Sequence, residues 1–250
     1  MDLNETKRNS SFLEGTKKSQ GFSLVNEGLR SYLMQVYKLM GLGLLVSALT
    51  AFLGTTPLFF NLLFTQTPQG IDFSILGIIV MIAPLILVFM FGSAVRKINP
   101  TKAQAIFWIF SALTGFSFSA ILLAFTAESL FQTFIITSGS FGALCLYGYT
   151  TKRDLTGLGA FMHMGLWGLI IAMIINFFLN SSPLAYAISI ISVIVFVGLT
   201  AFDTQNIKRM YDESDESDLV RTKAIYGALE LYLDFINLFI ALLRFTGNRK

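Results

Sequence analysis

Acidic and amide side chains inside an apolar segment are the residues of this sequence best suited to chemistry. The segment Ile225–Arg244, IYGALELYLDFINLFIALLR, is long and apolar enough to cross a bilayer as a helix. It carries Glu230, Asp234 and Asn237 at intervals of four and three residues, which places them on one helical face. A carboxylate near the bilayer centre costs roughly 3 kcal/mol or more to insert, so it normally faces a helix bundle or a water-filled cavity. We therefore expect other helices to enclose this one.

A second aspartate, Asp203, ends the apolar segment that precedes this one. With about 1.5 Å of rise per residue, Asp203 lies roughly 7 Å inward from Lys208 along its helix. By the same count, Asp234 lies roughly 16 Å inward from Lys223. A tilted or broken helix is therefore needed if the two carboxyl groups are to meet.

Two carboxyl groups that meet inside a membrane can act as a pH sensor. They cannot both ionise cheaply in a low-dielectric site, so they share a proton and titrate as a pair. When protonated, the pair holds two helices together; when ionised, it repels and offers oxygen ligands to a hard cation such as Ca²⁺. We expect Asp203 and Asp234 to form such a pair, both as a pH-sensing gate and as ligands of a passing metal ion. The alternative is that each aspartate separately caps or hydrogen-bonds a neighbouring helix.

The composition is that of an all-α integral membrane protein. Of 250 residues, 54% are hydrophobic and only 13% are charged, and the mean hydropathy is +0.67. An ordinary globular domain has about 25% charged residues. The single cysteine, Cys145, excludes an intrachain disulfide. Without a basic, aromatic-rich soluble module, nothing in the sequence indicates nucleic-acid binding.

The apolar segments predict seven transmembrane helices, six of them surrounding the C-terminal one. We expect residues 1–30 to form a flexible cytosolic tail, because they are polar and charged. The transmembrane domain then covers residues 31–246, and residues 247–250 form a C-terminal tail. The seven segments are 32–53, 75–91, 105–125, 130–149, 158–179, 184–202 and 225–244.

Lysine and arginine predict the orientation of these helices. They occur in the N-terminal tail and in the loops after the second, fourth and sixth segments, whereas loops 54–74, 126–129 and 180–183 contain neither. Because basic loops remain in the cytoplasm, we expect the N-terminus there. Seven crossings put Arg249 and Lys250 on the other side, against the charge bias. That exception leaves open whether the last segment crosses completely.

Further polar residues are candidates for lining a pore, namely Glu230, Asn237 and Asn206. Glu230 either deepens the negative field at a pore mouth or pairs with Lys223 or Arg221 at the start of its helix. Asn237 shares the face of Glu230 and Asp234, and Asn206 follows Asp203 by three residues.

Two other features each have an ordinary structural alternative. The only histidine, His163, either relays protons within the membrane or is a hydrogen-bonded packing residue. Ser111, Gly115 and Ser119 recur every four residues and form a ridge that lets a neighbouring helix approach closely, unless this small face arises by chance.

The last two segments resemble a known membrane family. GLTAFDTQNIKRMY (198–211) and ALELYLDFINLFIALLR (228–244) together resemble the paired C-terminal signature of the Bax inhibitor-1, or transmembrane Bax inhibitor motif, family, most of all its bacterial members. The resemblance implies a bacterial inner-membrane protein with six helices around the last one and a pH-sensitive Ca²⁺ leak. Calcium is then the transported ion, not a tightly bound cofactor. The family's proton-sensing aspartates match Asp203 and Asp234, and Arg96 is the candidate for a basic latch at the end of the second helix.

Two other classes of function would use the same features of the sequence. A membrane regulator could bind a membrane-embedded protease or a stress-response partner, as bacterial relatives do, through residues 1–30 and 207–224. An intramembrane aspartyl protease would also use two aspartates on late helices. The local sequences AFDTQ and YLDFIN lack the Gly-x-Gly-Asp and Pro-Ala-Leu patterns of such proteases, so we expect no enzyme activity and assign no catalytic residue.

Overall fold

The computed structural model describes residues 3–67 and 70–250, with side chains from Glu27 on except at residues 67, 71, 89 and 93–96. Eight helices and one two-stranded hairpin make up this part of the chain. In order they are α1 Leu3–Gly54, α2 Pro57–Leu63, β1 Phe64–Thr67, β2 Gly70–Phe73, α3 Ile75–Arg96, α4 Pro100–Ala124, α5 Ala127–Thr150, α6 Thr156–Leu179, α7 Ser182–Met210 and α8 Ser217–Thr246.

The predicted all-α membrane fold is confirmed. Every helix except α2 contains a stretch that is long and apolar enough to cross a membrane, seven in all. Each predicted segment coincides with one of these helices, and most of the helices continue beyond the apolar segment. Continuation is favourable because each added residue makes another backbone hydrogen bond, whatever the polarity of its side chain.

Two regions contain secondary structure that the sequence interpretation did not include. Helix α1 begins at Leu3, so helical backbone runs through the segment predicted as a tail, and the domain boundary at residue 30 stays a prediction. The loop 54–74 contains α2 and the antiparallel pair β1 and β2, in which Phe64 lies opposite Phe73. Gly70 begins β2 with a φ of +138°, which favours glycine because it has no Cβ.

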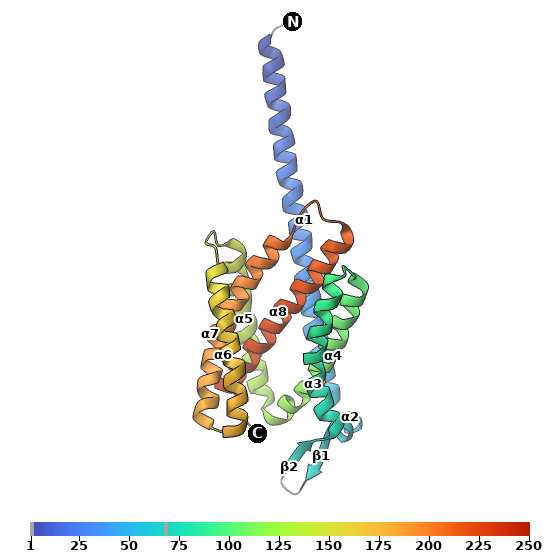
Figure 1. Cartoon of the computed structure of the whole chain (residues 1–250), viewed down its shortest axis with the longest axis vertical. Coiled ribbons are helices and arrows are strands. Elements are labelled where there is room, and N and C mark those ends of the chain that lie inside the picture. Colours follow the sequence, from blue (N-terminus) through green and yellow to red (C-terminus); the bar gives the residue numbers. More distant parts are fainter. Residues whose placement is uncertain (1–2, 68–69) are drawn as a thin grey trace.

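Helix α8 is the central helix of the bundle. In its membrane-spanning stretch 61% of the residues are buried by protein, against at most 44% in any other crossing helix. It packs against α1, α3, α4, α5 and α7, while α6 joins the bundle mainly through α7. Figure 1 shows α8 crossing the bundle obliquely between its neighbours. The enclosure expected for the acidic helix is therefore present.

Small residues allow α1, α4 and α8 to approach one another closely. Ser111 and Ser119 are fully buried, and a Cβ at Gly115 would lie 2.3 Å from the carbonyl oxygen of Ser47. Ser47 Oγ lies 2.7 Å from both the Ser111 carbonyl oxygen and the Tyr232 hydroxyl of α8. The small-residue ridge predicted on α4 is thus a contact surface for α1, not a chance pattern.

The bundle has two ends, and the loops assign them. We call the end with loops 97–99, 151–155 and 211–216 the basic end, and the end with residues 55–74, 125–126, 180–181 and 247–250 the opposite end. The chain after α8 lies at the opposite end, beside the α4–α5 junction (Figure 1). There the Thr126 N–H donates to the Asn248 carbonyl oxygen at 3.1 Å, and Arg249 forms a backbone bridge with Phe125. The last helix therefore crosses the whole bundle.

Candidate functional site

Helices α7 and α8 bring Asp203 and Asp234 together inside the bundle. The two side chains lie within reach of a mutual hydrogen bond, and the residues are only 8% and 4% exposed. The oblique course of α8 reduces the difference in depth estimated along straight helices, because each residue of a tilted helix advances less across the bundle (Figure 1). The geometry required of a carboxyl pair is thus present, and its role as a sensor stays a prediction.

The polar side chains in the turn of α7 around Asp203 make hydrogen bonds within their own helix, which allows this turn to be buried. The Thr200 hydroxyl donates to the Phe196 carbonyl oxygen at 2.7 Å, and the Thr204 hydroxyl donates to the Thr200 carbonyl oxygen at 2.8 Å. These polar groups satisfy their own helix, and their protons are not directed at the aspartate. Gly148 of α5 lies against this turn so closely that a Cβ would be 2.3 Å from the Ala201 carbonyl oxygen.

Two acidic oxygens at the pair lack a hydrogen-bond donor. Among the described residues, Asp234 Oδ2 and Glu230 Oε2 are buried and make no hydrogen bond. Glu230 precedes Asp234 by one turn, and its carboxyl group adjoins the Tyr226 hydroxyl on the same helix. A buried acceptor without a donor normally costs about 1–3 kcal/mol, so the cluster is incomplete when all of its acids are ionised.

Of the two alternatives for Glu230, the pairing with Lys223 or Arg221 at the start of α8 is wrong. The Lys223 ammonium group contacts the Asp215 carboxylate and the Met210 carbonyl oxygen, and the Arg221 guanidinium donates to the side-chain oxygen of Gln104. Both cations are held at the basic end by nearer partners. Glu230 therefore lies next to Asp234 without a basic partner in the described part of the chain.

Titratable side chains of two further helices face the pair. His163 of α6 lies near Asp203, and its Nδ1 donates to the Gly159 carbonyl oxygen at 2.8 Å. Its ring also packs edge to face against Phe202, with 5.8 Å between the ring centroids. His163 is therefore a packing residue that is hydrogen-bonded within its own helix. Cys145 of α5 lies near Asp234.

The remaining predicted residues lie at different depths. Asn206 is half-buried on α7, between the pair and the basic end. Asn237 donates to the Leu233 carbonyl oxygen at 2.8 Å and lines a cavity of about 130 Å³ on the other side of the pair. Arg96 is the last residue of α3, and its side chain lies outside the described residues, so its role as a latch stays a prediction.

The carboxyl pair does not resemble a resident metal site. Over the part of the chain that the structure describes, no group of three or more His, Cys, Asp or Glu is placed to hold a metal ion. Calcium takes roughly six to eight oxygen ligands. Asp203 and Asp234 could supply only part of such a shell.

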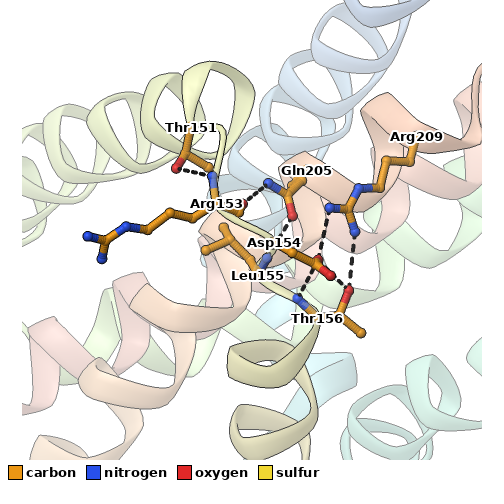
Figure 2. Close-up of polar contacts among 7 residues, drawn as sticks. All are labelled: Thr151, Arg153, Asp154, Leu155, Thr156, Gln205 and Arg209. Carbon is orange, nitrogen blue, oxygen red and sulfur yellow. Dashed lines mark hydrogen bonds and ion pairs between the residues drawn. The ribbon is translucent and has the colours of Figure 1, made fainter.

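Sequence interpretation missed a polar network that fastens α7 to the α5–α6 loop (Figure 2). Gln205 is 5% exposed and lies two residues after Asp203. Its Nε2 donates to the Arg153 carbonyl oxygen at 2.8 Å, and its Oε1 accepts from the Leu155 N–H at 2.9 Å. The sequence feature that could have revealed this network is a glutamine in an otherwise apolar helix. Gln205 follows Asp203 by two residues and therefore lies on a different helical face from it.

An exposed ion pair extends this network one turn further along α7. Arg209 Nη2 donates to Asp154 Oδ1 at 2.9 Å, and Nη1 donates to the Thr156 hydroxyl at 3.2 Å (Figure 2). Hydrogen bonds from the Thr156 side chain and backbone, and then from Arg209, lower the pKa of the Asp154 carboxyl group from 3.8 to about 2. The loop attachment is therefore fully ionised at neutral pH and takes no part in proton sensing there.

A sequence profile of the family described as "Inhibitor of apoptosis-promoting Bax1" matches residues 29–250, which include all seven crossing helices. The chain belongs to the Bax inhibitor-1 family. Both signature stretches and both aspartates lie within the matched region. The family resemblance of the last two helices is thus confirmed over most of the chain.

The relatives of this Bax inhibitor-1 family member are bacterial. The inner membrane protein YbhL of Escherichia coli strain K12 is 45% identical over 226 residues, which cover 89% of this chain and 94% of YbhL. The uncharacterized protein RP147 of Rickettsia prowazekii is 44% identical over 240 residues, 95% of this chain and 97% of RP147. An uncharacterized membrane protein of Streptococcus pyogenes serotype M1 is 41% identical over 221 residues, 88% of this chain and 94% of the relative. These relatives and the seven apolar helices fit a multi-pass inner membrane protein.

Proposed function

We propose that this Bax inhibitor-1 family protein is a pH-sensitive calcium leak channel gated by Asp203 and Asp234. The observation that carries the proposal is the contact of the two carboxyl groups inside the bundle, where Asp234 Oδ2 has no donor among the described residues. A proton shared by the pair supplies that donor. Closure then requires one proton, and its loss leaves two charges side by side.

The energy of this event is large enough to move helices. Two unit charges 4 Å apart repel each other by about 4 kcal/mol at an effective dielectric constant of 20. A difference of about 4 kcal/mol shifts a two-state equilibrium by roughly a thousandfold. The repulsion acts between α7 and α8, which are packed together along much of their length. Ionisation of the pair therefore favours separation of these helices, and protonation favours their contact.

Neighbouring groups tune the pair from three helices. Glu230 and Tyr226 lie on α8, Cys145 lies on α5 and His163 lies on α6. A charged Glu230 works against ionisation of the aspartates, whereas a protonated His163 favours it. The pH response belongs to this group of side chains as a unit, and each substitution in it is expected to shift the response.

The same acids would attract the ion that passes. Glu230 lies toward the basic end and Asn237 toward the opposite end, so a cation would meet carboxylate and amide oxygens in succession along α8. We infer that the basic end and the N-terminus face the cytoplasm, as the distribution of lysine and arginine predicts. Arg96 is included as the cation that latches onto the pair in the closed state, where the two carboxyl groups share one proton and keep one negative charge.

Calcium flux into proteoliposomes tests the proposal. Flux through the wild type should rise with pH, because the open state is the ionised one. Asp203→Asn and Asp234→Asn each remove one titrating group while keeping a similar shape, so both should abolish the dependence on pH. Glu128→Gln is the matched control, since Glu128 is an exposed acid at the opposite end whose carboxylate accepts a hydrogen bond from Gln132. A flat wild-type profile, or aspartate variants that still respond like the wild type, would contradict the gate.

A second function is favoured by the length of α1. This helix has 52 residues, about 78 Å at 1.5 Å per residue, whereas a bilayer core is about 30 Å thick. Figure 1 shows its N-terminal part projecting beyond the bundle at the basic end. We propose that this extension is a handle for a membrane-embedded protease or a stress-response partner. Deletion of residues 1–26 should abolish co-purification of such a partner and leave calcium flux intact; loss of flux alone would contradict this role.

A further inference from the structure

The polar face of α8 continues past the carboxyl pair to an arginine. Asn237 and Arg244 follow Asp234 by three and ten residues, which places all three on one side of the helix. The cavity of about 130 Å³ beyond the pair is lined by Asn237 and Arg244 and, from α7, by Ser189 and Ser192. The helix face that carries the acids therefore ends in a permanent positive charge.

Arg244 stands between this cavity and a wider groove. The groove, about 570 Å³ in volume, opens at the opposite end and is lined by Tyr186, Arg244 and Arg249, among others. Ser189, Ile240 and Arg244 line both the groove and the smaller cavity. A cation that travels from the carboxyl pair through the cavity to the groove must pass the Arg244 guanidinium.

Arg249 places a second positive charge in the same groove. Residues 248–250 are fastened to the α4–α5 junction, where the Lys250 N–H donates to the Ala124 carbonyl oxygen at 3.0 Å and the Asn248 N–H donates to the Ser129 hydroxyl at 2.9 Å. The Arg249 guanidinium lies 5.9 Å from the centre of the Phe125 ring. Arg249 is held close enough for its charge to act on Arg244.

Neither Arg244 nor Arg249 forms an ion pair with an acid in the described part of the chain. The ion pairs found there join Arg209 to Asp154 and Lys223 to Asp215, both at the basic end. The two guanidinium groups therefore bring positive charge to the point where the groove meets the internal cavity. Such charge lowers the local concentration of cations, and it does so more for divalent than for monovalent ions.

We infer that Arg244, supported by Arg249, is an electrostatic barrier that limits cation flux at the opposite end of the leak path. This inference rests on the proposed calcium leak and adds to it a residue that sets rate and selectivity. A unit charge about 6 Å from the path, in a water-filled mouth, reduces Ca²⁺ occupancy by about tenfold and K⁺ occupancy by about threefold. The barrier is independent of pH, because guanidinium stays protonated throughout the working range.

The test compares two variants of the full-length protein in proteoliposomes, with Ca²⁺ and K⁺ fluxes measured separately below and above neutral pH. Arg244→Gln should raise Ca²⁺ flux by about tenfold and K⁺ flux by about threefold at each pH. The rise of flux with pH should remain, because the carboxyl pair is intact. Arg244→Lys keeps the charge on a side chain of different shape, so both fluxes should stay within about twofold of the wild type.

The outcomes separate the barrier from the leak. Arg244→Gln fluxes equal to those of the wild type, or raised by the same factor for both ions, would overturn the barrier and leave the leak standing. Arg244→Lys fluxes as high as those of Arg244→Gln would also overturn it, because packing and not charge would then be the cause. If neither the wild type nor Arg244→Gln conducts, the leak and the barrier fall together. If Arg244→Gln raises Ca²⁺ flux more than K⁺ flux, but neither flux varies with pH, the barrier at Arg244 is supported and the gate formed by the carboxyl pair is refuted.

Discussion

Replacement of Gln205 by leucine should release the α5–α6 loop from α7. The side chain makes two hydrogen bonds to the loop backbone, one to the Leu155 N–H and one to the Arg153 carbonyl oxygen. Leucine has a similar volume and leaves both groups unpaired. Leu155 is 5% exposed, so its orphaned N–H costs about 1–3 kcal/mol. The Arg153 carbonyl group is in an exposed residue and can turn to water, so its loss adds little.

Hydrogen exchange of the loop amides measures this release. A weakening of about 2 kcal/mol should speed exchange at residues 151–156 by about thirtyfold. The transmembrane part of α8 should keep its protection, because its hydrogen bonds lie within the helix. Because Gln205 lies two residues from Asp203, the loosened turn of α7 should also alter the pH profile of calcium flux.

Arg209→Gln is the matched control for Gln205→Leu. It breaks an ion pair in the same network, but the two side chains are 48% and 68% exposed. Exposed pairs contribute about 0–1 kcal/mol, so loop exchange should change by less than about fivefold. Unchanged exchange in Gln205→Leu, or a larger effect of Arg209→Gln, would refute the assignment of the attachment to the buried amide.

Three more predictions concern the same framework. Because the folded-state pKa of Asp154 is about 2 and its ordinary value is 3.8, the stabilisation by its hydrogen bonds is complete above the ordinary value and is lost as pH falls toward about 2. The wild type should therefore protect its loop amides from hydrogen exchange better than Asp154→Asn does, by a factor that is constant near neutral pH and declines only in strong acid. A decline of this factor around neutral pH would contradict the prediction. Gly148→Ala should lower thermal stability by roughly 1–3 kcal/mol, since its Cβ would lie 2.3 Å from a backbone oxygen, whereas Gly139→Ala, with nothing within 4 Å, should be neutral or stabilising. Equal melting temperatures would refute the close packing of α5 on α7. Tyr232→Phe should cost about 1 kcal/mol through the lost contact with the Ser47 hydroxyl, and Ser47→Ala in that background should add less than it does alone. Additive losses in thermal unfolding would show that the two hydroxyl groups act independently.

Hydropathy alone determined the membrane class and the seven crossings. A sufficiently long apolar segment forms a helix in lipid, because no water is present there and the backbone must satisfy its hydrogen bonds within the segment itself. The acidic face of Ile225–Arg244 also predicted that this helix is the enclosed one, since carboxylates are excluded from lipid. These are properties of single helices, and a single sequence specifies them.

The contact of Asp203 with Asp234, by contrast, was decided by how α7 and the oblique helix α8 pack against each other (Figure 1). Spacing along the chain gave these residues different depths, because it measures distance along an axis and says nothing of the angle between two axes. Helix packing also decided three other features: the lack of a basic partner for Glu230, the attachment of the α5–α6 loop through Gln205, and the position of Arg244 between two cavities. Each depends on which neighbour a side chain meets across an interface, and that follows from how helices far apart in sequence pack, not from the period of any one of them.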